Sequence, residues 1–401
     1  MERRNIDVAI AGHIGFDIIP KFPPVNATAL TDVLVPGKLV NMEEAVVSSG
    51  GPVSNTGIAM SKLGLKVEFM AKISDDMFGK AILTLLKQYI KKPDGMHIAR
   101  NENTSYTIAI SVPGIDRLFL HCPGTNDSFG YADVNFNIVK KAKLFHLGYP
   151  PLMKNLYAND GAELIKIFKK AKSAGATTSL DMSLPDPNSE SGRVDWDKIL
   201  RRVIPYVDIL HPSIEEAMFM VNRQRYLQVK QESKGKDTVD FIKPEDFTKT
   251  SDILLGYGAK IITLKCGHNG FYVRTAGKNV LKDIGYAKPA DMDKWCNREL
   301  WSAAFRVEKI ASATGSGDSA LAGFITAYLK NEPVEVCIRC SNATGAQNIQ
   351  VFDAISGIKT WKETIKTALD PETKLETLEV SAPGWTFNST WKMFQGPENK
   401  S

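Results

Sequence analysis

Short apolar segments alternate with helix-forming segments along most of the chain, and this alternation constrains the fold more than any other feature. Residues 164–171 show the helical part of the pattern, because their apolar side chains share one face while lysines lie away from it. The expected strands are residues 6–11, 67–73, 144–147, 177–180, 207–210 and 260–264. Strands that alternate with helices form βαβ units whose strands run parallel. The sequence therefore predicts an α/β fold with a mainly parallel sheet.

Two segments near the N-terminus interrupt this order. Residues 14–47 contain several prolines and lack helical periodicity. Residues 105–112 and 117–122 flank a turn at Pro113-Gly114-Ile115-Asp116, a pattern that predicts a β-hairpin. We therefore expect residues 14–47 and 104–123 to build a small β-sheet lid outside the main body of the domain.

The last part of the chain differs in composition from the rest. Residues 370–401 are rich in proline and tryptophan, and they predict a C-terminal tail that wraps the domain and frays at its end. The domain itself is then expected to span residues 1–369. Within it, residues 223–243 are polar and charged, which indicates a surface insertion or a helix extension.

Charge and composition exclude several classes of partner. The 401 residues carry 50 basic and 45 acidic side chains, and no basic block with interleaved aromatics indicates a nucleic-acid surface. No signal-peptide core and no apolar run long enough to span a bilayer is present. The five cysteines form no pair of CxxC motifs, which favours reduced thiols. We expect a cytoplasmic protein that binds neither nucleic acid nor membrane.

The strongest chemical feature is the glycine-rich turn Thr314-Gly-Ser-Gly-Asp318, which a helix-forming run follows from about Gly317. Backbone amides at a helix N-terminus bind phosphate well, and glycines let the chain turn tightly there. Asp318 would then lie in the first helical turn, where its carboxylate could accept the proton of an attacking hydroxyl. The alternative is an ordinary loop in which Asp318 only caps the helix. The segment is not a Walker A loop, since no Gly-Lys-Ser/Thr follows the glycines.

A second glycine turn precedes another helix. Gly50 and Gly51 permit a close approach of the backbone to a ligand, and Asn55 offers both a donor and an acceptor. Taken alone, this pattern also fits simple helix capping.

Together the two turns resemble both signatures of the ribokinase-like, or PfkB, carbohydrate kinases. The first signature is matched by Gly50, Gly51, Asn55, Leu63, Gly64, Asp75 and Gly79, and the second by residues 314–318. The resemblance spans about residues 5–369. It implies a doubly wound α/β domain with helices on both faces of the sheet and a small β lid. The phosphoryl acceptor would lie between lid and sheet, with ATP beyond it.

The resemblance also implies roles for individual residues. Asp318 would be the general base, with the amides of Gly315, Ser316 and Gly317 as the anion hole for the transferring phosphoryl group. The acceptor would be bound by Asp17, Gly50, Gly51 and Asn55. The nucleotide would be bound by Lys265, Gly267, Gly270 and Asn342. Glu216 would help to organise Mg²⁺, and the lids of two subunits would pair in a homodimer.

Three departures from the family pattern bear on these roles. Ser213 replaces an asparagine beside Glu216, which weakens the Mg²⁺ assignment. Ser312 stands where an aspartate usually begins the second signature, and that aspartate is a ligand in K⁺-binding members, so activation by K⁺ is not expected. The arginine typical of keto-sugar-acid kinases is missing after Asp181, which disfavours such acids as acceptors.

Three functions remain open on these grounds. The first is an ATP-dependent kinase for a small sugar or sugar-like substrate. The second is a nucleoside kinase of the same fold, in which Phe16, Phe22, Phe119 and Phe129 could form a slot for the base or equally pack the lid. The third is a non-catalytic family member that binds nucleotide or sugar.

Overall fold

The computed structural model describes residues 4–90, 92–115 and 118–399. Its large sheet has ten strands in the order β15-β16-β14-β13-β12-β11-β10-β9-β1-β4. The parallel strands are β1 (Ile6–Gly12), β4 (Val67–Met70), β9 (Ala142–Gly148), β10 (Thr177–Asp181), β11 (Ile209–Leu210) and β12 (Ile261–Lys265). The antiparallel strands are β13 (Phe271–Thr275), β14 (Glu299–Ser302), β15 (Thr386–Asn388) and β16 (Met393–Gln395). The predicted mainly parallel sheet is confirmed.

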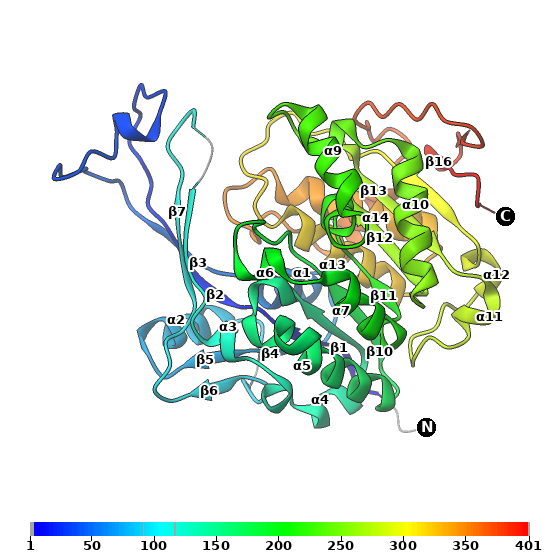
Figure 1. The fold of residues 1–401 in the computed structure, drawn as a ribbon, viewed down its shortest axis with the longest axis horizontal. Helices are drawn as coiled ribbons and strands as arrows, with labels where there is room; N and C mark the ends of the chain where they lie inside the picture. The colour runs from blue at the N-terminus through cyan, green and yellow to red at the C-terminus, as the bar shows by residue number, and fades with distance from the viewer. Residues whose placement is uncertain (1–3, 91, 116–117, 400–401) are drawn as a thin grey trace.

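Helices cover both faces of this sheet (Figure 1). Successive side chains of a strand point to opposite faces, so Val8 and Ile10 of β1 enter one core while Ala9 and Ala11 enter the other. The core around Val8 is closed by α1 (Pro52–Lys62), α2 (Met77–Leu86), α13 (Ser316–Leu329), α14 (Val334–Asn348) and α15 (Trp361–Leu369). The core around Ala9 is closed by α4 (Phe136–Lys141), α5 (Lys154–Ser173), α7 (Trp196–Val203), α8 (Ile214–Val221), α9 (Arg223–Ser233) and α10 (Pro244–Gly256). The predicted doubly wound architecture is therefore confirmed.

Short helices connect the larger elements. They are α3 (Thr125–Ser128), α6 (Glu190–Arg193), α11 (Lys278–Leu281) and α12 (Met292–Trp295). Local capping follows the sequence: the Asp76 side chain accepts from the Gly79 amide at the start of α2, and Ser213 and Glu216 form a capping box at the start of α8. In the part of the chain that the structure describes, no helix is both long and apolar enough to cross a bilayer.

A separate four-stranded sheet projects from the domain, at the left of Figure 1. Its order is β3 (Val46–Gly50), β2 (Gly15–Ile19), β7 (Tyr106–Ile110) and β8 (Leu118–Cys122), so it draws on both segments predicted for a lid. Part of the predicted hairpin turn, residues 116–117, lies outside the described residues. A third, two-stranded sheet pairs β5 (Lys72–Ser74) with β6 (His97–Ala99).

The prediction for the C-terminal segment needs correction. The C-terminal segment does not only wrap the domain, because β16 pairs with β14 and extends the large sheet. Its Trp385 ring lies 5.9 Å from that of Trp301, which anchors the segment to the core. Residues 223–233 form α9 directly after α8, which agrees with the predicted helix extension, and its Tyr226 and Val229 are buried in the core.

Candidate active site

The glycine turn opens α13 as predicted. Gly315 is the N-cap residue in the left-handed region, with φ of 74°, and the helix begins at Ser316, one residue earlier than expected. A Cβ atom on Gly315 would lie 2.5 Å from the Cβ of Ala354, so a larger residue fits neither the backbone angle nor the space. Because α13 is a long helix, its dipole and the amides of its first turn create a positive potential at its N-terminus. This potential suits the binding of an anion.

Asp318 lies in this first turn and is 3% exposed. Its Oδ2 accepts a hydrogen bond from Asn55 Nδ2 at 2.9 Å. Its Oδ1 accepts from the Tyr149 hydroxyl at 2.9 Å and from Thr56 Oγ1 at 3.3 Å. The carboxylate is thus held by donors from α1 and from the residue after β9, which join the two glycine turns into one site.

Sequence reasoning missed Tyr149 and Thr56. Tyr149 follows the carboxyl end of β9 in a left-handed conformation, with φ of 64°. In open α/β sheets, ligands bind at the carboxyl ends of the parallel strands. The position of Tyr149 just after a predicted strand is therefore the feature from which a role in the site could have been predicted. Thr56 follows Asn55 directly, but nothing in the sequence pattern shows that both reach Asp318.

Burial raises the pKa of the Asp318 carboxyl above its usual value, while the hydrogen bonds from Asn55, Tyr149 and Thr56 and the charge of Lys265 oppose the rise. Burial and nearby carboxylates raise the pKa of the Tyr149 phenol well above its usual value, so this hydroxyl stays protonated and remains a donor. A buried carboxylate with a raised pKa is a stronger proton acceptor than an exposed one, which suits a general base.

Lys265 lies within a cluster of carboxylates at the end of β12. Its Nζ is 2.6 Å from Asp181 Oδ1 and 3.8 Å from Glu216 Oε2. Burial alone would lower the pKa of the Lys265 ammonium, but the charges of Asp181, Glu216 and Asp318 raise it. Lys265 was predicted to bind the nucleotide, and the structure places its ammonium among these acids. Its stem lies against the α13 turn, 3.3 Å from a Cβ built on Gly317.

The acids of this cluster outnumber their cation. Burial raises the pKa of Asp181 to about 7 despite Lys265, and it also raises the pKa of Glu216. Asp181 is fully buried, and its Oδ2 has no hydrogen-bond partner among the described residues. A surplus of buried negative charge with an unpartnered oxygen is the kind of environment that attracts a further cation.

The predicted nucleotide turn lies beside this cluster. Residues 267–269 form a 3₁₀ turn between β12 and β13, and Gly267 and Gly270 both have positive φ. Asn342 on α14 is buried, and its Nδ2 donates to Ser302 Oγ at 3.2 Å and to the Ala303 carbonyl at 2.8 Å. This amide therefore ties α14 to the end of β14.

On the acceptor side, a polar row crosses the lid. Asp17 of β2 pairs in register with Thr107 of β7, which pairs with His121 of β8. Asp17 and Thr107 are hydrogen bonded, and Thr107 Oγ1 is 3.0 Å from His121 Nδ1. The Asp17 carboxylate lies over Gly50, where an added Cβ would sit 2.0 Å from Oδ2. The predicted residues Asp17 and Gly50 are thus in contact.

His13 continues this row toward the base and was not predicted. Its ring centroid is 5.5 Å from that of His121 and 6.4 Å from that of Tyr149. Both of its ring nitrogens are buried without a partner among the described residues. Gly51 makes room for this ring, since a Cβ there would lie 2.5 Å from His13 Nδ1. Burial lowers the pKa of His13 to about 3 and also lowers that of His121, so both imidazoles are neutral near pH 7.

Most of the phenylalanines considered for a nucleobase slot are used in packing. Phe16 stacks on Phe78 at 5.3 Å between ring centroids, against α2. Phe129 is fully buried in the core around Ala9, and Phe22 is 7% exposed. Phe119 of β8 is 52% exposed. The side chains that contact Asp318 are instead those of Asn55, Thr56 and Tyr149, each through a polar group.

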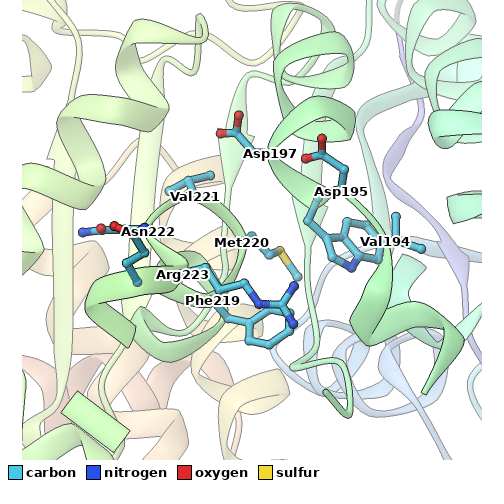
Figure 2. A pocket seen from close by; sticks show the side chains of 10 residues that line it. Val194, Asp195, Asp197, Phe219, Met220, Val221, Asn222 and Arg223 are labelled. Atoms are coloured by element: carbon cyan, nitrogen blue, oxygen red, sulfur yellow. The ribbon is translucent and has the colours of Figure 1, made fainter. Parts of the chain in front are cut away.

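A cavity of about 350 Å³ lies elsewhere, between the start of α7 and the end of α8 (Figure 2). Arg223 covers the Phe219 ring there, with its guanidinium carbon 4.3 Å from the ring centroid, and donates to the Gly192 carbonyl. None of the residues predicted for the site lines this cavity.

Comparisons with known proteins match most of the chain. The profile of the family described as pfkB family carbohydrate kinase matches residues 25–361. A protein of Archaeoglobus fulgidus described as an uncharacterized sugar kinase is 22% identical over 301 residues, which cover 75% of this chain and 98% of that protein.

Solved structures show the same fold. Arabidopsis thaliana ribokinase complexed with ribose and ATP matches with a TM-score of 0.63 and 17% identity, over 90% of this chain and 98% of that chain. A Methanocaldococcus jannaschii nucleoside kinase of the ribokinase family matches with a TM-score of 0.59 and 17% identity, over 91% and 98%.

Proposed function

Because the chain belongs to the pfkB family of carbohydrate kinases, we propose that it transfers a phosphoryl group from ATP to a hydroxyl of a small sugar or sugar-like substrate. One observation carries this proposal: Asp318 stands between the amides of the α13 turn and the polar row that runs through His13 to Asp17. A carboxylate placed between an anion site and a hydroxyl site is what phosphoryl transfer to an alcohol needs.

In this proposal each residue of the site has a role in the reaction. The acceptor hydroxyl lies against Asp318, whose carboxylate takes the proton as the hydroxyl oxygen attacks the γ-phosphorus of ATP. The bond between that phosphorus and the leaving ADP oxygen breaks. The amides of Gly315, Ser316 and Gly317 hold the phosphoryl oxygens while charge builds on them. The acceptor is oriented by Asp17, Gly50, Gly51 and Asn55, and the Asn55 Oδ1, which is buried without a partner among the described residues, is available to a substrate hydroxyl.

The residues of the site also fit Mg²⁺ bound together with ATP. In the described part of the chain, no three His, Cys, Asp or Glu side chains are grouped to hold a metal ion alone. Mg²⁺ bound with nucleotides takes one or two carboxylates, waters and phosphate oxygens, so it needs no such group. Glu216 and the unpartnered Asp181 would hold its waters, and the ion would neutralise phosphate charge. The 267–270 turn would carry the nucleotide.

A neutral polyhydroxy acceptor fits better than a nucleoside. The row on the lid presents a carboxylate, a hydroxyl and two neutral imidazoles, all of which exchange hydrogen bonds with sugar hydroxyls. A screen of ADP release with sugars, sugar acids, polyols and nucleosides tests this choice. We expect ADP release with a neutral sugar or polyol. Release with nucleosides alone would favour the nucleoside kinase, and ATP binding without turnover on any acceptor would favour a binding protein.

The acceptor affinity should depend on pH through Asp17. Burial raises the pKa of this carboxyl to about 7, against the opposing hydrogen bond from Thr107. Below that pH the group is protonated and no longer accepts as a carboxylate, so the acceptor KM should rise as the pH falls. Asp17→Asn should raise KM about tenfold, the effect of losing a hydrogen bond to a charged group, and remove the pH dependence. Asp32→Asn, an exposed change in the lid segment, is the control. An unchanged pH profile in Asp17→Asn would contradict the assignment.

Tyr149→Phe should shift the pH profile of kcat. The hydroxyl donates to Asp318 and so stabilises its charged form. Its loss raises the pKa of Asp318, and the acid limb of the profile should move to higher pH by about one unit. The KM for ATP should stay the same. Tyr286→Phe, at a residue that is 40% exposed, should leave the profile unchanged. A Tyr149→Phe enzyme with the wild-type acid limb would rule out this role.

The remaining proposals concern assembly and location. We propose that the lids pair in a homodimer, since Val46, Val47, Leu118 and Leu120 of the lid strands are exposed apolar side chains. The cytoplasmic location and the absence of K⁺ activation stay predictions from the sequence.

A further inference from the structure

The C-terminal segment, residues 370–399, lies outside the part of the chain that the family profile matches, which ends at residue 361. Strand β16 of this segment, red in Figure 1, extends the large sheet by pairing with β14. The segment also contacts the elements to which the nucleotide is assigned, and it does so by two separate routes.

The first route follows the backbone that leaves β14. The Glu376 amide donates to the Ala304 carbonyl at 2.8 Å, and the Arg306 amide donates to the Lys374 carbonyl at 2.9 Å. The residues between these pairs form an antiparallel bridge. The C-terminal segment therefore fixes the course of residues 304–306 by backbone hydrogen bonds.

Two residues assigned to the nucleotide rest on the same stretch of backbone, at residues 302–304. Gly270 of the nucleotide turn packs so closely against it that an added Cβ would lie 2.0 Å from the nearest carbonyl oxygen. The Asn342 side chain donates to the Ala303 carbonyl at 2.8 Å. A displacement of this backbone would therefore move it away from both the turn and the amide.

The second route passes through two tryptophans. The Trp385 ring packs edge-on against that of Trp301, with 5.9 Å between the ring centroids. Trp301 is 3% exposed, and its indole nitrogen donates to the Asn269 carbonyl at 2.9 Å. Asn269 ends the 3₁₀ turn that leads into Gly270. Trp385 thus supports the ring whose hydrogen bond holds the nucleotide turn.

A buried arginine fastens the segment to the helix that carries Asn342. Arg339 lies on α14, one turn before Asn342, and is 4% exposed. Its guanidinium donates to the Ala368 carbonyl, to the Asp370 carbonyl at 3.4 Å and to the Trp391 carbonyl at 3.3 Å. Two distant points of the segment are thereby held by one side chain of this helix.

We propose that the C-terminal segment is a positioning element for ATP, in which residues 374–376 and Trp385 hold the 302–306 backbone and the 267–270 turn in the arrangement that binds the nucleotide. This role rests on the proposed function, because it assumes that the turn and Asn342 bind ATP. Since both routes end at the nucleotide elements, loss of either should weaken ATP binding and leave the KM for the acceptor within about twofold.

The experiment measures the dissociation constant for ATP by calorimetry with Mg²⁺, and the free energy of unfolding with urea, on full-length variants. Glu376→Pro removes the amide that donates to Ala304, and Trp385→Ala removes the ring behind Trp301. Each should weaken ATP binding about fivefold, the size expected when one hydrogen bond or one aromatic pair is lost.

Two matched controls lie in the same segment. Glu379→Pro places a proline at an exposed position, and Phe387→Ala removes an aromatic ring that is 56% exposed. Both should bind ATP like the wild type. The KM for the best acceptor from the screen is measured for all four variants.

The role would be overturned if Glu376→Pro and Trp385→Ala lose stability but bind ATP as tightly as the wild type, because the segment would then only stabilise the fold. A rise in the acceptor KM as large as the loss of ATP affinity would contradict it as well. If Glu376→Pro does not fold, Trp385→Ala decides by the same criteria. A wild-type protein that binds no ATP would instead remove the proposed function itself.

Discussion

Asp318→Asn is expected to lower kcat by about 10²–10⁴, the usual contribution of a general base, and to leave the affinity for ATP within about twofold. The asparagine keeps the shape of the side chain, and the Asn55 amide can turn to present its oxygen to the new NH₂ group. The Tyr149 hydroxyl still finds an oxygen acceptor. What is lost is the group that takes the proton of the acceptor hydroxyl.

The measurement compares steady-state ADP release with calorimetric ATP binding in the same preparations. Asp293→Asn is the matched control, because this aspartate also lies in the first turn of a helix but is exposed and pairs with Lys278. It should behave like the wild type. An Asp318→Asn enzyme with more than about a tenth of the wild-type kcat would contradict the role of the base.

Lys265→Met is expected to have the largest effect on stability. The side chain is 12% exposed and is the cation of a cluster that contains the fully buried Asp181 and Glu216, whose side chain is 13% exposed. Removal of one partner from a buried ion pair typically costs about 3–5 kcal/mol. Because the pKa of Asp181 is about 7 even beside Lys265, we expect this acid to take up a proton when the ammonium is removed. The free energy of unfolding, measured with urea at pH 7, should fall by about that amount.

Two companion variants separate the charge effect from a packing effect. Lys265→Met combined with Asp181→Asn should recover part of the lost stability, because the buried carboxylate is removed as well. Lys198→Met breaks the exposed pair with Asp160 and should leave the unfolding midpoint almost unchanged. A Lys265→Met protein as stable as the wild type would show that Asp181 and Glu216 do not depend on this ammonium.

Local patterns in the sequence were enough to predict the main elements. The period of apolar residues predicts the parallel strands and the helices on either side, and the Asp76 and Ser213 caps follow from residue type alone. Gly315 and Asp318 were placed correctly because a glycine turn and a helix start are both local features. The two strands near the C-terminus, β15 and β16, were missed because each has only three residues, too few to show a period.

The contacts inside the site could not be predicted, because they join elements that are far apart in the chain. The Asn55 and Asp318 side chains meet across 263 residues, and Tyr149 reaches Asp318 from the end of another strand. His13 and His121 meet only when the lid folds over the sheet. Lys265 was assigned to the nucleotide from the family resemblance, and only the structure shows the acids around it.

The central claim is that Asp318 serves as the base when a phosphoryl group passes from ATP to a hydroxyl of a small, sugar-like acceptor. ³¹P NMR of a reaction with ATP, Mg²⁺ and the best acceptor from the screen tests it most directly. We predict a new phosphomonoester resonance that grows in step with ADP for the wild type and is almost absent for Asp318→Asn. Formation of inorganic phosphate without an ester, or equal ester formation by Asp318→Asn, would contradict the claim.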